Sequence, residues 1–167
     1  MKLEEALVAA IGYEKKIRDV YREAAESVTD PVGRGILRTL GDDEQRHVDY
    51  LQDRLERWRK TGRLDVEALE SAIPPKKTLE QEARKHADTL PGNPRGDEKQ
   101  VLSRALKVEV ETSDFYRDMV LKMSGEARDL FSGFLEIEER HVAAVQAELD
   151  YYSRTGYWFD IKEFDME

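Results

Sequence analysis

The sequence contains no cysteine, and its 167 residues include only five prolines and few aromatic side chains. Without cysteine the chain can hold no disulfide, no thiolate nucleophile and no cysteine-ligated zinc or iron–sulfur site. No stretch approaches the roughly 20 consecutive apolar residues that a membrane-spanning helix needs. We therefore expect a cytoplasmic protein with no membrane partner, in which any metal is bound by nitrogen and oxygen atoms.

Basic residues are also in short supply, because 27 Lys and Arg face 36 Asp and Glu and give a formal net charge of -9. That balance argues against binding driven by nucleic-acid phosphates, whereas small cations are natural partners. The mean hydropathy of -0.72 is low, but the apolar residues are strongly patterned. The length fits one compact domain, which we expect to span residues 1–167.

Four long segments have apolar residues at alternating spacings of three and four, which is typical of helices that pack in a bundle. We predict one hairpin over about residues 3–60 and a second over about 97–154. A long crossover of about 61–96 contains a short helix near 77–90, and a tail covers 155–167. The predicted fold is an all-α, ferritin-like four-helix bundle of two antiparallel hairpins.

Local signals place the helix ends. Asp30 followed by Pro31 starts the second helix, and Thr61-Gly62 stops it. Asp97 with Gln100 resembles a capping box for the third long helix, Ser124 can cap the fourth, and Thr155-Gly156 ends it.

The two hairpins are related by an internal repeat. Glu14 and Glu109 are 95 positions apart, and so are Tyr21 and Tyr116, whereas Glu44 to Glu138 and His47 to His141 are offsets of 94. Any two amphipathic hairpins share apolar spacing, but here the polar residues match as well. We therefore expect the halves to pack about a pseudo-twofold axis.

The matched polar residues interrupt the apolar seam near the middle of each helix. A buried carboxylate without a partner costs several kcal/mol, and a cation between several carboxylates removes that cost. In each Glu-x-x-His pair the two side chains lie one turn apart on one helix face. Four carboxylates and two imidazoles suit two ions, iron or manganese before zinc. The predicted ligands are Glu14, Glu44, His47, Glu109, Glu138 and His141.

This set of residues resembles the rubrerythrin branch of the ferritin-like superfamily, across all four bundle helices. The resemblance implies two iron ions, with manganese as the alternative. It also implies that Glu14 and Glu109 are terminal ligands, that Glu44 and Glu138 are bridging ligands, and that each metal receives one histidine. The expected activity is that of a di-iron oxidoreductase, a peroxidase or oxidase that reacts with peroxide or dioxygen in protection against oxidative stress.

Two features depart from rubrerythrins. The rubredoxin domain of that family needs cysteine, so this sequence implies an external electron donor. Rubrerythrins commonly have a further glutamate one turn after the third-helix ligand, where this chain has Thr112. Without that glutamate, the set of predicted ligands resembles the more symmetric centre of bacterioferritin-like ferroxidases. We expect a homodimer that binds no nucleic acid.

Several neighbouring residues have simpler interpretations. Tyr21 and Tyr116 each lie two turns beyond a ligand glutamate, where the phenol can orient a carboxylate, although tyrosine is also an ordinary seam residue. The acids beside the ligands are expected to be solvated or capping charges. The lone histidine of the crossover is expected either at the surface or with its hydrogen bonds satisfied by the protein, and the aromatic tail is expected to pack on the helices or on a partner subunit. These residues are Asp42, Asp43, His86, Glu136, Glu139, and Tyr157 to Phe159.

Two other functions remain open from the sequence. In the first, the protein handles iron as a ferroxidase, and ferrous iron is the substrate. In the second, the chain is a metal-stabilised helical interaction module without redox activity. Metal stoichiometry and solution mass distinguish these hypotheses.

Overall fold

The computed structural model describes residues 1–161, and within them the chain forms five helices and no strand. The prediction of an all-α protein is therefore confirmed for this part of the chain. The helices are α1 (Leu3–Ser27), α2 (Pro31–Thr61), α3 (Lys76–Lys85), α4 (Gly96–Lys122) and α5 (Gly125–Thr155).

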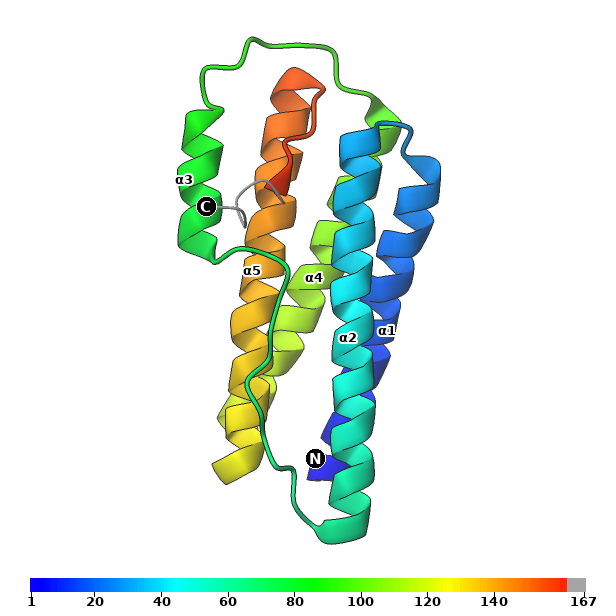
Figure 1. Ribbon diagram of the computed structural model, residues 1–167, viewed down its shortest axis with the longest axis vertical. Coiled ribbons are helices and arrows are strands. Elements are labelled where there is room, and N and C mark those ends of the chain that lie inside the picture. Colours follow the sequence, from blue (N-terminus) through cyan, green and yellow to red (C-terminus); the bar gives the residue numbers. More distant parts are fainter. Residues whose placement is uncertain (162–167) are drawn as a thin grey trace.

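The four long helices form two neighbouring pairs, α1 with α2 and α4 with α5, and α1 also contacts α4 (Figure 1). The segment between α2 and α4 runs back along the length of the molecule, and α3 packs against α5 within it. Two hairpins joined by a long crossover with a short helix were predicted, and the structure contains these parts.

Most of the predicted helix ends are confirmed. Asp30 caps α2, since its Oδ1 accepts hydrogen bonds from the backbone N–H groups of Val32 at 2.8 Å and Gly33 at 3.3 Å. Gly62 and Gly156 end α2 and α5 with φ of 70° and 75°. This left-handed conformation carries a steric cost for any residue with a Cβ, which explains glycine at both ends.

Three local predictions were wrong. Helix α4 begins at Gly96 after the N-cap residue Arg95, and its start has no side-chain cap, so Asp97 does not form a capping box. The Asp97 carboxylate instead pairs with the Arg95 guanidinium at 3.0 Å. Ser124 occupies the N-cap position of α5 without a capping hydrogen bond. Helix α3 covers Lys76–Lys85, which is shorter than the predicted 77–90 at its C-terminal end.

The apolar core is divided into two clusters. One surrounds Ile17, Leu37 and Val145, and the other surrounds Leu7, Leu51 and Phe131. The predicted polar residues lie between these clusters in sequence on every long helix. Apolar side chains on both sides therefore shield the middle of the molecule from water, which strengthens electrostatic interactions there.

The start of the C-terminal tail packs on the helices. Trp158 and Phe159 are buried, as predicted for the tail, whereas Tyr157 is 61% exposed and does not pack on the helices. A Cβ atom on Gly33 would lie 2.6 Å from the Trp158 ring, so the close approach requires glycine there. Buried Glu148 accepts a hydrogen bond from the backbone N–H of Phe159 at 3.3 Å. Tail residues after 161 lie outside the described part.

Two remaining expectations concern the placement of His86 and the absence of a membrane-spanning helix. His86 is partly buried against the rings of Tyr151 and Phe159, at centroid distances of 5.4 and 5.5 Å, so it is a packing residue more than a surface one. Among residues 1–161, every helix is too short or too polar to cross a lipid bilayer.

Candidate metal centre

Six buried polar side chains meet in the layer between the two apolar clusters. Helices α1 and α4 each contribute one glutamate, and α2 and α5 each contribute a glutamate and a histidine one turn later. Each of the six is at most 1% exposed. They are the residues predicted from the repeat, namely Glu14, Glu44, His47, Glu109, Glu138 and His141.

These side chains fall into two overlapping groups of four. Within each group, one ligand atom from every residue lies within 4.8 Å of the others. His47 and Glu14 belong to one group, and His141 and Glu109 belong to the other. Glu44 of α2 and Glu138 of α5 belong to both groups. The arrangement therefore contains two adjacent positions suitable for cations, with two carboxylates placed between them.

The histidines approach the shared carboxylates through the same ring nitrogen. Nδ1 of His47 lies 3.0 Å from Glu44 Oε2 and 3.6 Å from Glu138 Oε1. Nδ1 of His141 lies 2.6 Å from Glu44 Oε1 and 4.0 Å from Glu138 Oε1. The two rings are nearly parallel, with centroids 5.6 Å apart. Both imidazoles thus direct Nδ1 at the carboxylates and leave Nε2 for the surrounding protein.

Each terminal glutamate is held by a tyrosine from the other half of the repeat. The hydroxyl of Tyr116 donates to Glu14 Oε1 at 2.5 Å, and the hydroxyl of Tyr21 donates to Glu109 Oε1. Burial, with the neighbouring carboxylates, raises the pKa of both phenols well above 10. The tyrosines are therefore neutral donors that fix the orientation of these carboxylates.

The charges of the cluster determine where protons are held. Burial and the charges of Glu14, Glu44 and Glu109 raise the pKa of Glu138 well above 4.5. Burial also raises the pKa of Glu44, to about 8, although His141 opposes the shift. For Glu14 the effect of burial is outweighed by the hydrogen bond and charge of His47, with hydrogen bonds of Glu44 and Tyr116, and the pKa is lowered. The shared carboxylates therefore bind protons readily when no cation is present.

Donor atoms without partners provide a direct test of whether a cation fits. Within residues 1–161, Glu14 Oε2, Glu109 Oε2 and both carboxylate oxygens of Glu138 are buried without a hydrogen-bond partner. His47 Nδ1 is the nearest basic group to two of these oxygens, at 3.4 Å from Glu14 Oε2 and 3.6 Å from Glu138 Oε1, and makes a hydrogen bond to neither. Buried oxygens without hydrogen bonds are costly, and a cation would relieve that cost. Oxygen and imidazole donors of this kind coordinate iron and manganese. The residues present could therefore hold metal ions.

Asp43 is a residue whose position sequence reasoning did not predict. It was expected at the surface, but it is fully buried, and its Oδ2 lies 2.7 Å from Nε2 of His141. The same carboxylate accepts from Ser71 Oγ at 2.6 Å, the Ala72 backbone N–H at 3.2 Å and Arg46 at 2.5 Å. Burial alone would raise the pKa of Asp43, but the hydrogen bond and charge of His141 hold it well below its usual range.

The second half has no equivalent of this carboxylate. The residue 94 positions after Asp43 is Ile137, and Nε2 of His47 is buried without a hydrogen-bond partner among the described residues. Thr112 is buried, but its hydroxyl donates to the Val108 carbonyl at 2.8 Å, so it adds no ligand to the layer. The two halves of the centre are therefore related but unequal.

The other acids beside the candidate ligands lie at the surface, as predicted. Asp42, Glu136 and Glu139 are exposed, and Glu139 pairs with Arg117 at 3.6 Å. Comparison of the chain with protein-family models, curated protein sequences and solved structures returned no match. The case for function therefore rests on the geometry of the buried layer.

Proposed function

We propose that this chain is a di-iron carboxylate protein with a ferritin-like four-helix bundle, related to rubrerythrins, and that it reduces peroxide or dioxygen. The observation that carries the proposal is the pair of overlapping four-residue groups in a fully buried layer. A buried cluster of four carboxylates is hard to explain without cations, because like charges repel and desolvation is costly.

Each residue of the layer has a defined role in this proposal. Glu44 and Glu138 belong to both groups and would bridge the two metal positions. Glu14 and Glu109 would bind one metal each, and the hydrogen bonds from Tyr116 and Tyr21 hold them in place. His47 and His141 would complete the two positions through Nδ1. Iron is preferred, and manganese fits the same donors.

The surrounding protein provides orientation and a dry environment. Two bound ferrous ions would supply the two electrons that reduce hydrogen peroxide to two water molecules, a reaction that also takes up two protons. Phe134 packs edge-on against His47 at a centroid distance of 5.4 Å and stacks on Tyr116 at 5.1 Å. These rings keep water from one side of the layer, so the carboxylates interact strongly with bound charge. Electrons for repeated turnover would come from an external donor.

Anaerobic titration with ferrous iron tests the proposal directly. The purified protein should saturate near two ions per chain, and Glu138→Gln should reduce that number. The matched control is Glu139→Gln, which changes the exposed neighbouring acid and should leave saturation at two. Folded wild-type protein that binds well under one ion per chain would contradict the proposal.

A second candidate is a ferroxidase, in which ferrous iron is the substrate. The position of Thr112 favours it, because its hydroxyl is bonded to the backbone and no further carboxylate follows Glu109 on that face. The two functions differ in what happens with excess ferrous iron and dioxygen. A ferroxidase oxidises many ions per chain, whereas a peroxidase stops near two until a reductant is added.

A further inference from the structure

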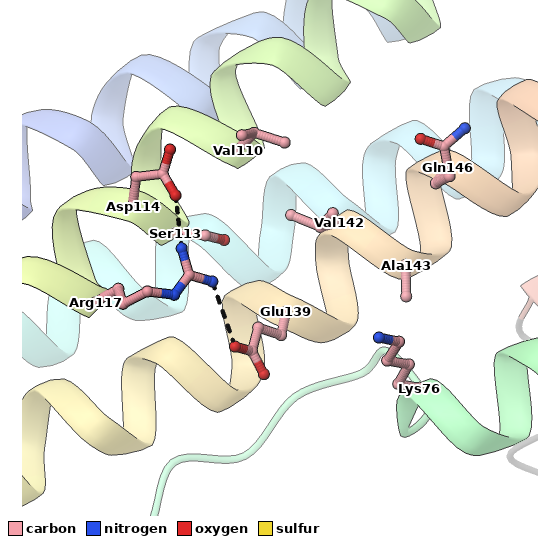
Figure 2. A pocket seen from close by; sticks show the side chains of 9 residues that line it. All are labelled: Lys76, Val110, Ser113, Asp114, Arg117, Glu139, Val142, Ala143 and Gln146. Carbon is pink, nitrogen blue, oxygen red and sulfur yellow. Dashed lines mark hydrogen bonds and ion pairs between the residues drawn. The ribbon is translucent and has the colours of Figure 1, made fainter.

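A groove of about 390 Å³ opens between α4 and α5, beside the start of α3 (Figure 2). Its floor is mostly apolar, and charged side chains lie at its rim. The groove is lined by Lys76, Val110, Ser113, Asp114, Arg117 and four residues of α5, Glu139, Val142, Ala143 and Gln146.

The groove lies immediately outside the buried layer. Val110 follows Glu109 in α4, and Ser113 lies one turn beyond that glutamate. In α5, Val142 follows His141. The residues of the groove thus alternate with the proposed ligands on the same two helices.

Ser113 is a polar residue in this wall with no structural use for its hydroxyl. It is 4% exposed, and its Oγ has no hydrogen-bond partner among residues 1–161. Figure 2 places its side chain on the groove side of α4. An unpaired buried hydroxyl carries a cost, so a small molecule that hydrogen-bonds there would relieve it.

The internal repeat shows that the two halves differ at this position. The residue 95 positions before Ser113 is Arg18, whose Nη1 donates to Gln45 Oε1 at 2.9 Å across α1 and α2. Arg22 reaches the same amide oxygen at 3.2 Å. The Arg18 side chain is only 17% exposed, so a large, mostly buried side chain stands in the first half where the second half has a small serine.

The lining indicates which reactant uses the groove. The lining contains two basic residues, Lys76 and Arg117, and two acidic ones, Asp114 and Glu139, so its formal charges cancel. Arg117 pairs with Asp114 at 2.6 Å and with Glu139 at 3.6 Å. Val142 and Ala143 make the floor apolar. A divalent cation would gain little from this surface, whereas a small uncharged molecule would lose little hydration on entering it.

We propose that this groove is the entry route for a small uncharged oxidant, hydrogen peroxide, and that Ser113 hydrogen-bonds to it on the way to the metal pair. The inference rests on the proposed function, because it assumes a metal pair behind the wall. Motion of the side chains at Ser113 and Val142 would open the final passage.

Ser113→Arg tests the route by placing in the second half the arginine that the first half has at the matching position, Arg18. Anaerobic titration should still give two ferrous ions per chain, since no ligand has changed. The rate constant for oxidation of the loaded protein by hydrogen peroxide should fall by about tenfold or more. Val142→Phe narrows the same groove from α5 and should act in the same way. Arg18→Ser is the matched control and should not slow the reaction.

Binding of nitric oxide to the anaerobic ferrous protein gives a second readout that needs no turnover. Its association rate should fall in Ser113→Arg and Val142→Phe and stay unchanged in Arg18→Ser. Wild-type rates in both groove variants, with two ions bound, would overturn the route and leave the di-iron proposal intact. Failure of the wild type to bind iron would instead remove the proposed function.

Ser113→Ala separates the hydrogen bond from the opening. It should slow the reaction with hydrogen peroxide but not the reaction with dioxygen, because only peroxide can donate to and accept from the hydroxyl. If Ser113→Ala reacted with hydrogen peroxide and with dioxygen at the same rates as the wild type, Ser113 would have no role in recognising peroxide.

Discussion

Replacement of Asp43 by asparagine should weaken metal binding more than it weakens folding. His141 can bind a metal through Nδ1 only if that atom carries no proton, so its proton must lie on Nε2. The Asp43 carboxylate accepts the hydrogen bond from that N–H group, with Oδ2 2.7 Å from Nε2. Asparagine can offer its NH2 group there, which favours the opposite tautomer with the proton on Nδ1.

The contacts of Asp43 indicate the size of each effect. The carboxylate takes part in four hydrogen bonds, and an NH2 group at the Oδ2 position cannot accept the two from His141 and Ser71. In the metal-free protein the Ser71 hydroxyl can rotate to accept from that NH2 group, so the main loss is the charge-assisted bond to His141, which costs about 2 kcal/mol. For a chain of this length that corresponds to a decrease of about 4 to 8 °C in Tm. Loss of a partner that orients a metal-bound histidine typically reduces metal affinity by about 10- to 100-fold.

Two measurements on the same variant check this reasoning. Urea denaturation of the metal-free protein gives the free energy of unfolding, and competition with a chromophoric chelator gives the affinity for Co²⁺, which is not oxidised by air. Asp42→Asn changes the exposed neighbouring residue and serves as the control. If Asp43→Asn matched Asp42→Asn in both measurements, the assignment of Asp43 as a positioning residue would be refuted.

Three further perturbations have defined outcomes. The folded-state pKa of Glu44, about 8, lies above its ordinary 4.5, and the pKa of Glu138 is also raised. The metal-free protein should therefore lose stability as pH rises from about 4.5 through 8. Thermal melts at several pH values would show this loss, and bound metal should make the melting temperature depend less on pH. Burial, with the charges of Asp160 and Asp30, raises the pKa of Glu148. Glu148→Gln should therefore stabilise the protein at pH values above the ordinary carboxyl pKa of 4.5 and not at lower pH. Urea denaturation at pH 4 and pH 8 measures this, and equal changes in unfolding free energy at both pH values would contradict it. Tyr116→Phe removes a donor to Glu14 and should cost about 1 to 3 kcal/mol of unfolding free energy, and an unchanged urea midpoint would count against the bond.

The helices and the six residues of the buried layer could be predicted because both depend on periodicity. A glutamate at a seam position in each of four helices must lie in the interior if the seam does. The repeat then distinguishes these acids from ordinary surface acids, as the burial of Glu14 and Glu109 shows. Whether the layer holds iron stays a prediction that titration must test.

Other features depend on contacts between distant segments, which periodicity does not encode. Asp43 lies beside the seam of α2, and it is buried because Ser71 and Ala72 of the crossover cover it. The open groove likewise depends on the contrast between Arg18 and Ser113, which has meaning only when the two hairpins are superposed. Helix α3 ends early at Lys85, where the His86 ring stacks on the tail residue Phe159.

The exchange of tyrosine hydrogen bonds between the halves bears on how such a protein could have arisen. Tyr21 of the first hairpin donates to Glu109 of the second, and Tyr116 of the second donates to Glu14 of the first. Neither hairpin satisfies its own pair, so a lone ancestral hairpin would have needed a second copy of itself. Duplication and fusion of its gene would join two such copies, and the crossover would then be a covalent tether that lets the halves diverge, as Asp43 and Ile137 have done.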